Sequence, residues 1–189
     1  MPYRTIQPPF TLKFREMSRK ELKDYCAWFH GVRSQRLCEL AAAVLETPGY
    51  EGWRPDPTPE SLGELGAWFA SEVQTRPRTS DEIQDIESRL TMRIDIPRDE
   101  LSNRTFSLAI DVGMYLSEVL IKNHPSLRWG QEFGSKLSVD YGQPVLIGFG
   151  AVPFNPVHML VTLAYGLAGK KKTGEGLRQI YDIWSKLVS

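Results

Sequence analysis

Residues 99–122, DELSNRTFSLAIDVGMYLSEVLIK, read as a helix that is apolar around almost its whole circumference. The stretch contains no proline, and it is about 36 Å long if it is helical throughout at about 1.5 Å per residue. Such a helix is normally covered by neighbours on most sides. Residues 99–122 therefore predict the central element of the fold, with Leu108, Val112 and Val119 fully buried.

One narrow polar strip runs along this predicted helix. At about 100° per residue, Asp111, Tyr115 and Glu118 project within about 60° of one another. Arg104 and Lys122 lie at the two ends of the strip, and His124 follows the helix directly. These six residues are the candidate binding residues of the chain.

Three interpretations of the strip remain open. Two carboxylates on one face can act as acid and base if burial separates their pKa values, or they can hold a ligand or partner by hydrogen bonds. They can equally belong to a buried structural network. The simplest interpretation is a solvated edge, in which Glu118 pairs with Lys122 at the favourable i, i+4 spacing.

The rest of the N-terminal part is also predicted to be helical. Ser18 and Glu21 have the spacing of a capping box, which starts a helix that continues to about Leu45. A proline-rich loop at 48–59 separates it from a second helix, which starts at Thr58 and ends before residues 76–78. A third helix starts at Ser80, places an apolar stripe of Ile83, Ile86 and Leu90 toward the core, and ends before Pro97.

The pattern becomes extended after Pro125. Residues 127–129, 136–141 and 144–149 are predicted as strands, with a hairpin over 136–149 that turns at Gly142. Pro144 should begin its strand, because proline cannot donate to a ladder. Two further helices are predicted from Asn155 to Gly169 and from about Thr173 to the end. The sequence therefore predicts an α+β fold, mostly helical, with a small three-stranded antiparallel sheet between residues 126 and 150.

Length and composition favour one domain over residues 1–189, with a helical part at about 18–123 and a sheet with two helices at about 126–188. The net charge is zero, but residues 1–55 and 126–189 each carry +3 and residues 56–125 carry −6. A nucleic-acid module usually has a concentrated basic face, so nucleic acid is not the expected partner. The simplest explanation of the charge pattern is attraction between these segments of one fold.

Membrane insertion and secretion are not expected. No apolar run reaches the length of a membrane span, and the first residues lack a basic region followed by an apolar core. Cys26 and Cys38 lie about 18 Å apart on one predicted helix, beyond the reach of a disulfide. Two unpaired thiols are typical of a cytoplasmic protein.

Recognisable catalytic and cofactor motifs are not found in the sequence. The three histidines lie on separate elements without metal-binding spacing. The glycines at 148–150 and 169–174 lack the pattern of a phosphate-binding loop. The sequence therefore predicts neither a metal nor a cofactor.

The motif D-x-G-x-Y-x-x-E at 111–118, then Trp129, then PVLIGF at 144–149, resembles a pattern in small uncharacterised bacterial proteins. The resemblance covers roughly residues 100–157. Some small α+β bacterial families of this kind are immunity proteins against toxins. The resemblance implies a bacterial cytoplasmic binding protein, and it implies no catalytic residues.

Two functions are therefore carried forward. The first is a non-catalytic protein that binds another protein, as an immunity-like or accessory factor. The second is a small enzyme or ligand-binding protein with a pocket lined by Asp111, Tyr115 and Glu118. A flat surface would favour the first and a deep pocket the second. The oligomeric state is not indicated by the sequence.

Overall fold

The computed structural model describes residues 3–90 and 95–189. Within these residues the chain forms six α-helices and two small antiparallel sheets, which confirms the α+β class. The helices are α1 (Arg19–Leu45), α2 (Ser61–Glu72), α3 (Ser80–Arg89), α4 (Asn103–Asn123), α5 (Pro156–Ala168) and α6 (Glu175–Ser185). The strands are β1 (Thr75–Pro77), β2 (Asp99–Leu101), β3 (Arg128–Gln131) and β4 (Pro144–Ile147).

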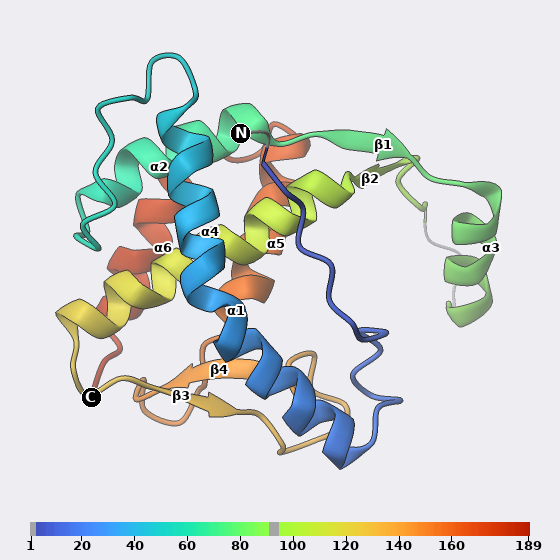
Figure 1. Cartoon of the computed structure of the whole chain (residues 1–189). Coiled ribbons are helices and arrows are strands. Elements are labelled where there is room, and N and C mark those ends of the chain that lie inside the picture. Colours follow the sequence, from blue (N-terminus) through green and yellow to red (C-terminus); the bar gives the residue numbers. More distant parts are fainter. Residues whose placement is uncertain (1–2, 91–94) are drawn as a thin grey trace.

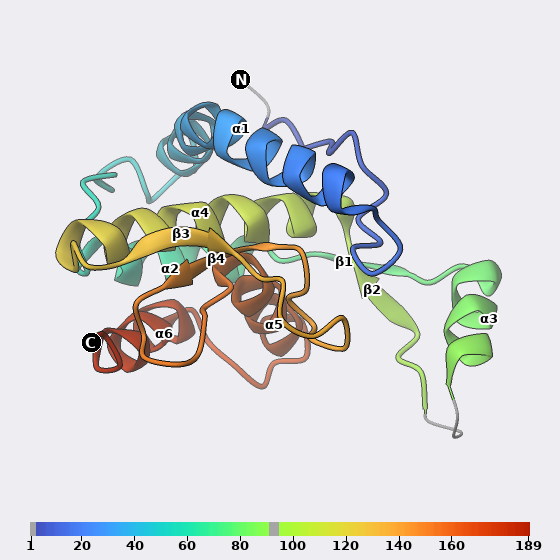
Figure 2. The ribbon, with the colours of Figure 1, turned by 90° about the horizontal axis from the view of Figure 1, so that it is seen from below.

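The helix α4 lies at the centre of the fold, as predicted. Figure 2 shows it between α1 on one side and α5 and α6 on the other. Leu108, Val112 and Val119 have no exposed surface. The helix begins at Asn103 and not at Asp99, because residues 99–101 pair with β1 and the Ser102 side chain then accepts the N–H of Thr105 as the N-cap.

The sheet between residues 126 and 150 is present but differs from the prediction. β3 pairs with β4 in the register Arg128↔Ile147 to Gln131↔Pro144, and Pro144 begins its strand as expected. In place of a third strand, the single residue Phe154 forms an isolated antiparallel bridge with Leu146.

The predicted strand at 136–141, and with it the hairpin over 136–149, is wrong. The Ser135 hydroxyl accepts the N–H of Leu137, and the Ser138 hydroxyl accepts the N–H of Asp140. Side-chain oxygens of this kind compete with a ladder for backbone donors and favour turns. Gly142 adopts a positive φ of 75° inside the long β3–β4 connection, where it does not form the tip of a hairpin.

The second sheet was not predicted. β1 pairs with β2 from Thr75↔Leu101 to Pro77↔Asp99, and this ribbon carries α3. Figures 1 and 2 show α3 standing clear of the other helices at the end of the ribbon. No residue of α3 is buried, and Ile83, Ile86 and Leu90 are only half-buried. The prediction that this stripe faces the core is therefore wrong.

The N-terminal segment before α1 crosses the outside of the molecule along α1 (Figure 2). Its aromatic side chains Phe10 and Phe14 pack edge-on against Tyr25 of α1. Together with Tyr141 from the β3–β4 connection they surround a small second core, separate from the main one. This second core fixes the position of the segment relative to that connection.

Candidate functional site

The polar strip of α4 is divided among three separate contacts in the structure. Asp111 faces α1 and the N-terminal segment, whereas Tyr115 faces α2. Glu118 faces a different turn of α1. The six candidate residues therefore do not line one common space.

Asp111 is fully buried and belongs to a hydrogen-bonded network. The Arg36 guanidinium of α1 donates to its two carboxylate oxygens from Nε at 2.9 Å and from Nη2 at 2.6 Å. The Tyr3 hydroxyl also donates to the carboxylate. Ser107, one turn before Asp111, receives the N–H of Ile6 at 2.7 Å. This network holds the N-terminal segment against α1 and α4.

Within the described residues, the nitrogen atoms of Arg36 in this network are all engaged. Arg36 also donates from Nη1 to the Arg4 carbonyl and to the Glu39 carboxylate, so each of its three nitrogen atoms has an acceptor. Burial raises the pKa of the Asp111 carboxyl, while the bonds from Arg36 and Tyr3 oppose this rise by favouring the carboxylate. The chemistry of Asp111 is structural: it joins three segments of the chain.

Tyr115 forms a second structural contact. Its hydroxyl lies 2.7 Å from the Ser61 hydroxyl at the start of α2, and its ring packs against Trp53 at 5.4 Å between centroids. Burial raises the pKa of Tyr115 to about 12. The phenol is therefore protonated at neutral pH and is not poised as a base.

Glu118 pairs with Arg33 of α1, and not with Lys122. Arg33 also lies over the ring of Trp129 at 5.1 Å and within 3.3 Å of His30. Lys122 donates to the carbonyl of Asp56 at 2.6 Å instead. The predicted i, i+4 pair is wrong, because Glu118 pairs with Arg33 and Lys122 donates to the loop before α2.

The remaining candidates lie at the two ends of α4. Arg104 pairs with Glu72 of α2 at 2.5 Å. His124 is the C-cap residue, and its ring packs against Tyr181 of α6 at 6.2 Å between centroids. Among the described residues neither side chain bonds to Glu118 or Asp111, but Arg104 also lies 5.7 Å from the ring centroid of Tyr3, which donates to Asp111.

The charge pattern along the sequence is partly explained by these contacts. Arg33 and Arg36 belong to the basic first segment, and their partners Glu118 and Asp111 belong to the acidic middle segment. These two ion pairs confirm attraction between the segments. Attraction between the first and the middle segment therefore accounts for part of the charge asymmetry.

The Glu118→Gln variant is expected to lose about 1 kcal/mol of unfolding free energy, because a partly exposed ion pair contributes modestly. Lys122→Met should change it by no more than about 0.5 kcal/mol. Urea denaturation of both variants, of Arg33→Met and of the two double variants checks this. Glu118 and Arg33 should be non-additive, while Glu118 and Lys122 should be additive; the reverse pattern would contradict the observed pairing.

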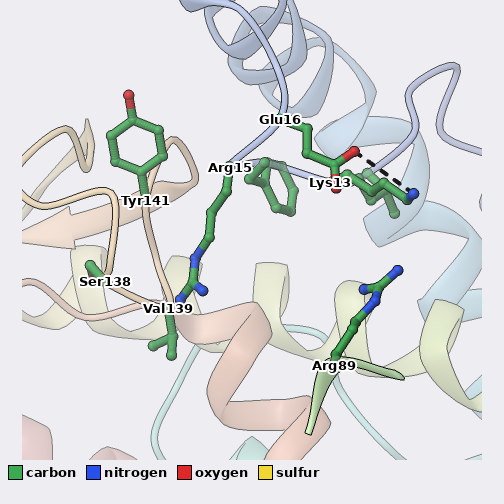
Figure 3. Close-up of a pocket in the computed structure, with 9 residues that line it drawn as sticks. Lys13, Arg15, Glu16, Arg89, Ser138, Val139 and Tyr141 are labelled. Atoms are coloured by element: carbon green, nitrogen blue, oxygen red, sulfur yellow. Dashed lines mark ion pairs between the residues drawn. The ribbon is translucent and has the colours of Figure 1, made fainter. Parts of the chain in front are cut away.

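A surface hollow of about 360 Å³ lies between the N-terminal segment, the β3–β4 connection and the end of α3. Figure 3 shows Arg15 and Arg89 reaching into the same space from different elements. Leu137 beside it is 83% exposed and Val139 in its wall is 63% exposed. The residues that line it are Leu12, Lys13, Phe14, Arg15, Glu16, Arg89, Ser138, Val139 and Tyr141. We call these nine residues the hollow.

The hollow is cationic. Three of its side chains are basic and one, Glu16, is acidic. Glu16 pairs with Lys13 at 3.7 Å, and Arg89 pairs with Asp85 of its own helix at 2.9 Å. Arg15 donates to the carbonyl of Leu137 at 2.9 Å and has no acidic partner among the residues that the structure describes. The hollow thus combines exposed apolar side chains with an uncompensated guanidinium.

A second hollow, of about 540 Å³, lies between residues 3–7 and α1. Its charged residues are paired with one another, because Arg4 lies 3.3 Å and Arg36 lies 3.0 Å from Glu39. A charged ligand would have to break these pairs. The first hollow is therefore the better candidate for a binding site.

The hollow was missed by sequence reasoning because its walls come from three distant segments. One signal was present: Leu137 and Val139 alternate with polar residues, in the stretch 136–141 that we interpreted as a strand. In the structure the segment forms turns and both side chains are exposed.

Comparison with family models, with curated proteins and with solved structures finds no match to this chain. The resemblance of residues 100–157 therefore stays a prediction. In the described part of the chain, no helix is long and apolar enough to cross a membrane. Residues 3–90 and 95–189 also contain no group of three or more His, Cys, Asp or Glu side chains that could hold a metal.

Proposed function

We propose that this chain is a non-catalytic, cytoplasmic bacterial protein that binds another protein, as an immunity-like or accessory factor would. The partner lies on the hollow and presents acidic and apolar side chains to it. The observation that carries the proposal is the exposed combination of Leu137, Val139 and the unpaired Arg15 at one place.

The structural contacts of the polar-strip residues support a binding function over an enzymatic one. Asp111, Tyr115 and Glu118 each have a structural partner, and no common pocket joins them. At the hollow, in contrast, the exposed apolar side chains Leu137 and Val139 lie beside Arg15, which has no acidic partner among the described residues. Clusters of exposed apolar side chains on a folded protein are typical of interaction sites.

The charge of the hollow favours an acidic partner. Charged groups at an interface contribute most to partner choice and to the rate of association. Arg15 can donate to a carboxylate without losing an existing ion pair. The thiols Cys26 and Cys38 are both free in the structure, which fits the proposed reducing compartment.

Photo-crosslinking from the rim of the hollow tests this proposal. A benzoylphenylalanine placed at Leu137 in the full chain is expected to give discrete adducts in cells of the native host. Sequencing by mass spectrometry should then identify an acidic protein segment as the linked peptide. The same group at Glu64, an exposed residue of α2, is the control; Figure 1 shows the label of α2 on the opposite side of the molecule from α3.

The Arg15→Glu change provides the decisive comparison. If an acidic segment occupies the hollow, this change should remove the Leu137 adducts, whereas Arg54→Glu on the exposed loop before α2 should leave them. Equal labelling from Leu137 and Glu64, a linked peptide without excess acidic residues, or adducts that survive Arg15→Glu would each overturn the proposal.

A further inference from the structure

Among the residues that the structure describes, α3 is an amphipathic helix that belongs to neither hydrophobic core. The β1–β2 ribbon holds it away from the main layers (Figures 1 and 2). Its stripe of Ile83, Ile86 and Leu90 is half-buried, and none of its residues is fully buried. An isolated helix of this length is marginal in water and normally gains its stability by packing an apolar face.

The helix is also strongly acidic. Residues 80–90 carry four acidic side chains and one basic side chain. Glu82 accepts two bonds from Arg76, at 2.6 and 2.9 Å, and these bonds together with the N-cap Thr79 lower the pKa of Glu82 to about 2. Asp81 and Glu87 are exposed, and neither side chain has an ion-pair partner in the described residues.

The α3 helix and the hollow are complementary in charge and in polarity. The helix offers the free carboxylate of Glu87 beside its apolar stripe, and the hollow offers the guanidinium of Arg15, which has no acidic partner among the described residues, beside Leu12 and Val139. We propose that the occupant of the hollow is α3 of a second copy of this chain. The inference rests on the proposed function, for which it names the partner.

A second copy fits better than the chain's own α3. The α3 helix of the same copy already contributes Arg89 to the lining, so it forms one wall of the hollow (Figure 3). An occupant must therefore come from outside. In a two-fold dimer each copy gives its α3 and receives the other, which is the self-complementary arrangement of an isologous interface. Arg15 of one copy then faces Glu87 of the other.

Sedimentation of the purified full chain tests this arrangement. At up to about 100 µM, where weak association is detectable, the chain is expected to form dimers. Arg15→Glu and Glu87→Lys should each weaken dimerisation about tenfold or more, because like charges then face each other. The double variant Arg15→Glu with Glu87→Lys should recover it, since the opposite charges face each other again.

The same two charge reversals at exposed residues elsewhere in the chain serve as matched controls. Arg54→Glu and Glu64→Lys reverse charges of the loop and of α2 and should leave dimerisation unchanged. A chain that is monomeric at up to about 100 µM would overturn the inference. So would dimers that persist in both single variants, or a double variant that stays monomeric.

The crosslinking experiment separates this inference from the proposed function. If the Leu137 adduct contains residues 75–101 of a second copy, identified by mixing isotopically labelled and unlabelled chains, the second-copy inference and the binding role of the hollow are supported, and the bound protein is this chain itself and not a different one. If it contains an acidic segment of a different protein, the second-copy inference fails and the proposed function stands. If Leu137 gives no adduct, both fail.

Discussion

The Asp111→Ala variant is expected to lose about 3 kcal/mol of unfolding free energy, the low end of the cost of breaking a buried ion pair. The change removes an acceptor that binds Arg36 at 2.9 and 2.6 Å and also binds Tyr3. Arg36 remains buried, with 7% of its side chain exposed. The Glu39 carboxylate, 3.0 Å from Arg36, still balances part of the buried positive charge in this variant. The expected loss is therefore at the low end.

An exposed pair on α1 provides the control for this measurement. Asp24 lies 2.9 Å from Lys20, and both side chains are largely in solvent. Asp24→Ala should therefore cost no more than about 0.5 kcal/mol. Urea or thermal unfolding compares the two variants. A loss below about 1 kcal/mol for Asp111→Ala would show that the buried network contributes little to holding the N-terminal segment.

A double variant separates the cost of an unpaired charge from the value of the pair itself. Arg36→Met with Asp111→Leu removes both charges, so neither is left buried without its partner. Its loss should be smaller than that of Asp111→Ala, because apolar replacement of a whole buried pair is often neutral. A larger loss would show that the remaining bonds of Arg36, to Arg4 and Glu39, carry the stability.

The helices could be predicted because their signals are local. The Ser18–Glu21 capping box forms as expected, and Asn155 accepts the N–H of His158 at the start of α5. The apolar periodicity of α4 gave its central position. Each of these signals lies within a few residues of the element that it specifies, so no knowledge of the fold is needed to read it.

The sheets and the partners of α4 depend on contacts between distant residues. β1 and β2 are separated by α3, so neither short strand has a neighbour that would reveal it. The Tyr3 hydroxyl reaches Asp111 across 108 positions of sequence. Periodicity placed Asp111 and Glu118 on one face correctly, but it gives no information about which arginine of α1 meets each carboxylate.

The candidate site was beyond prediction for the same reason. Its walls come from the N-terminal segment, the β3–β4 connection and the end of α3. The sequence showed that Ile83, Ile86 and Leu90 form an apolar stripe, and we placed that stripe in the core. The ribbon carries α3 outward, so that the same stripe lies outside both hydrophobic cores.

The Gly66→Ala variant is expected to lose at least about 3 kcal/mol of unfolding free energy, because a tightly packed contact has no room for a methyl group. A Cβ atom on Gly66 would lie 2.1 Å from the carbonyl oxygen of Gly174 and 3.1 Å from Cβ of Leu177. The first of these is a backbone atom at the start of α6, and Leu177 is fully buried. Relief would require α2 and α6 to move apart.

Gly63 on the same helix is the matched control, because a Cβ atom there would meet nothing within 4 Å. Gly63→Ala should raise the unfolding free energy by about 0.5 kcal/mol, since alanine favours a helix over glycine. Chemical denaturation of the two variants therefore gives shifts of opposite sign for the same substitution. If Gly66→Ala were also neutral or stabilising, α2 and α6 would not approach as closely as the structure places them. The sign depends on the neighbouring helix, because Gly63 faces open space whereas Gly66 faces the start of α6.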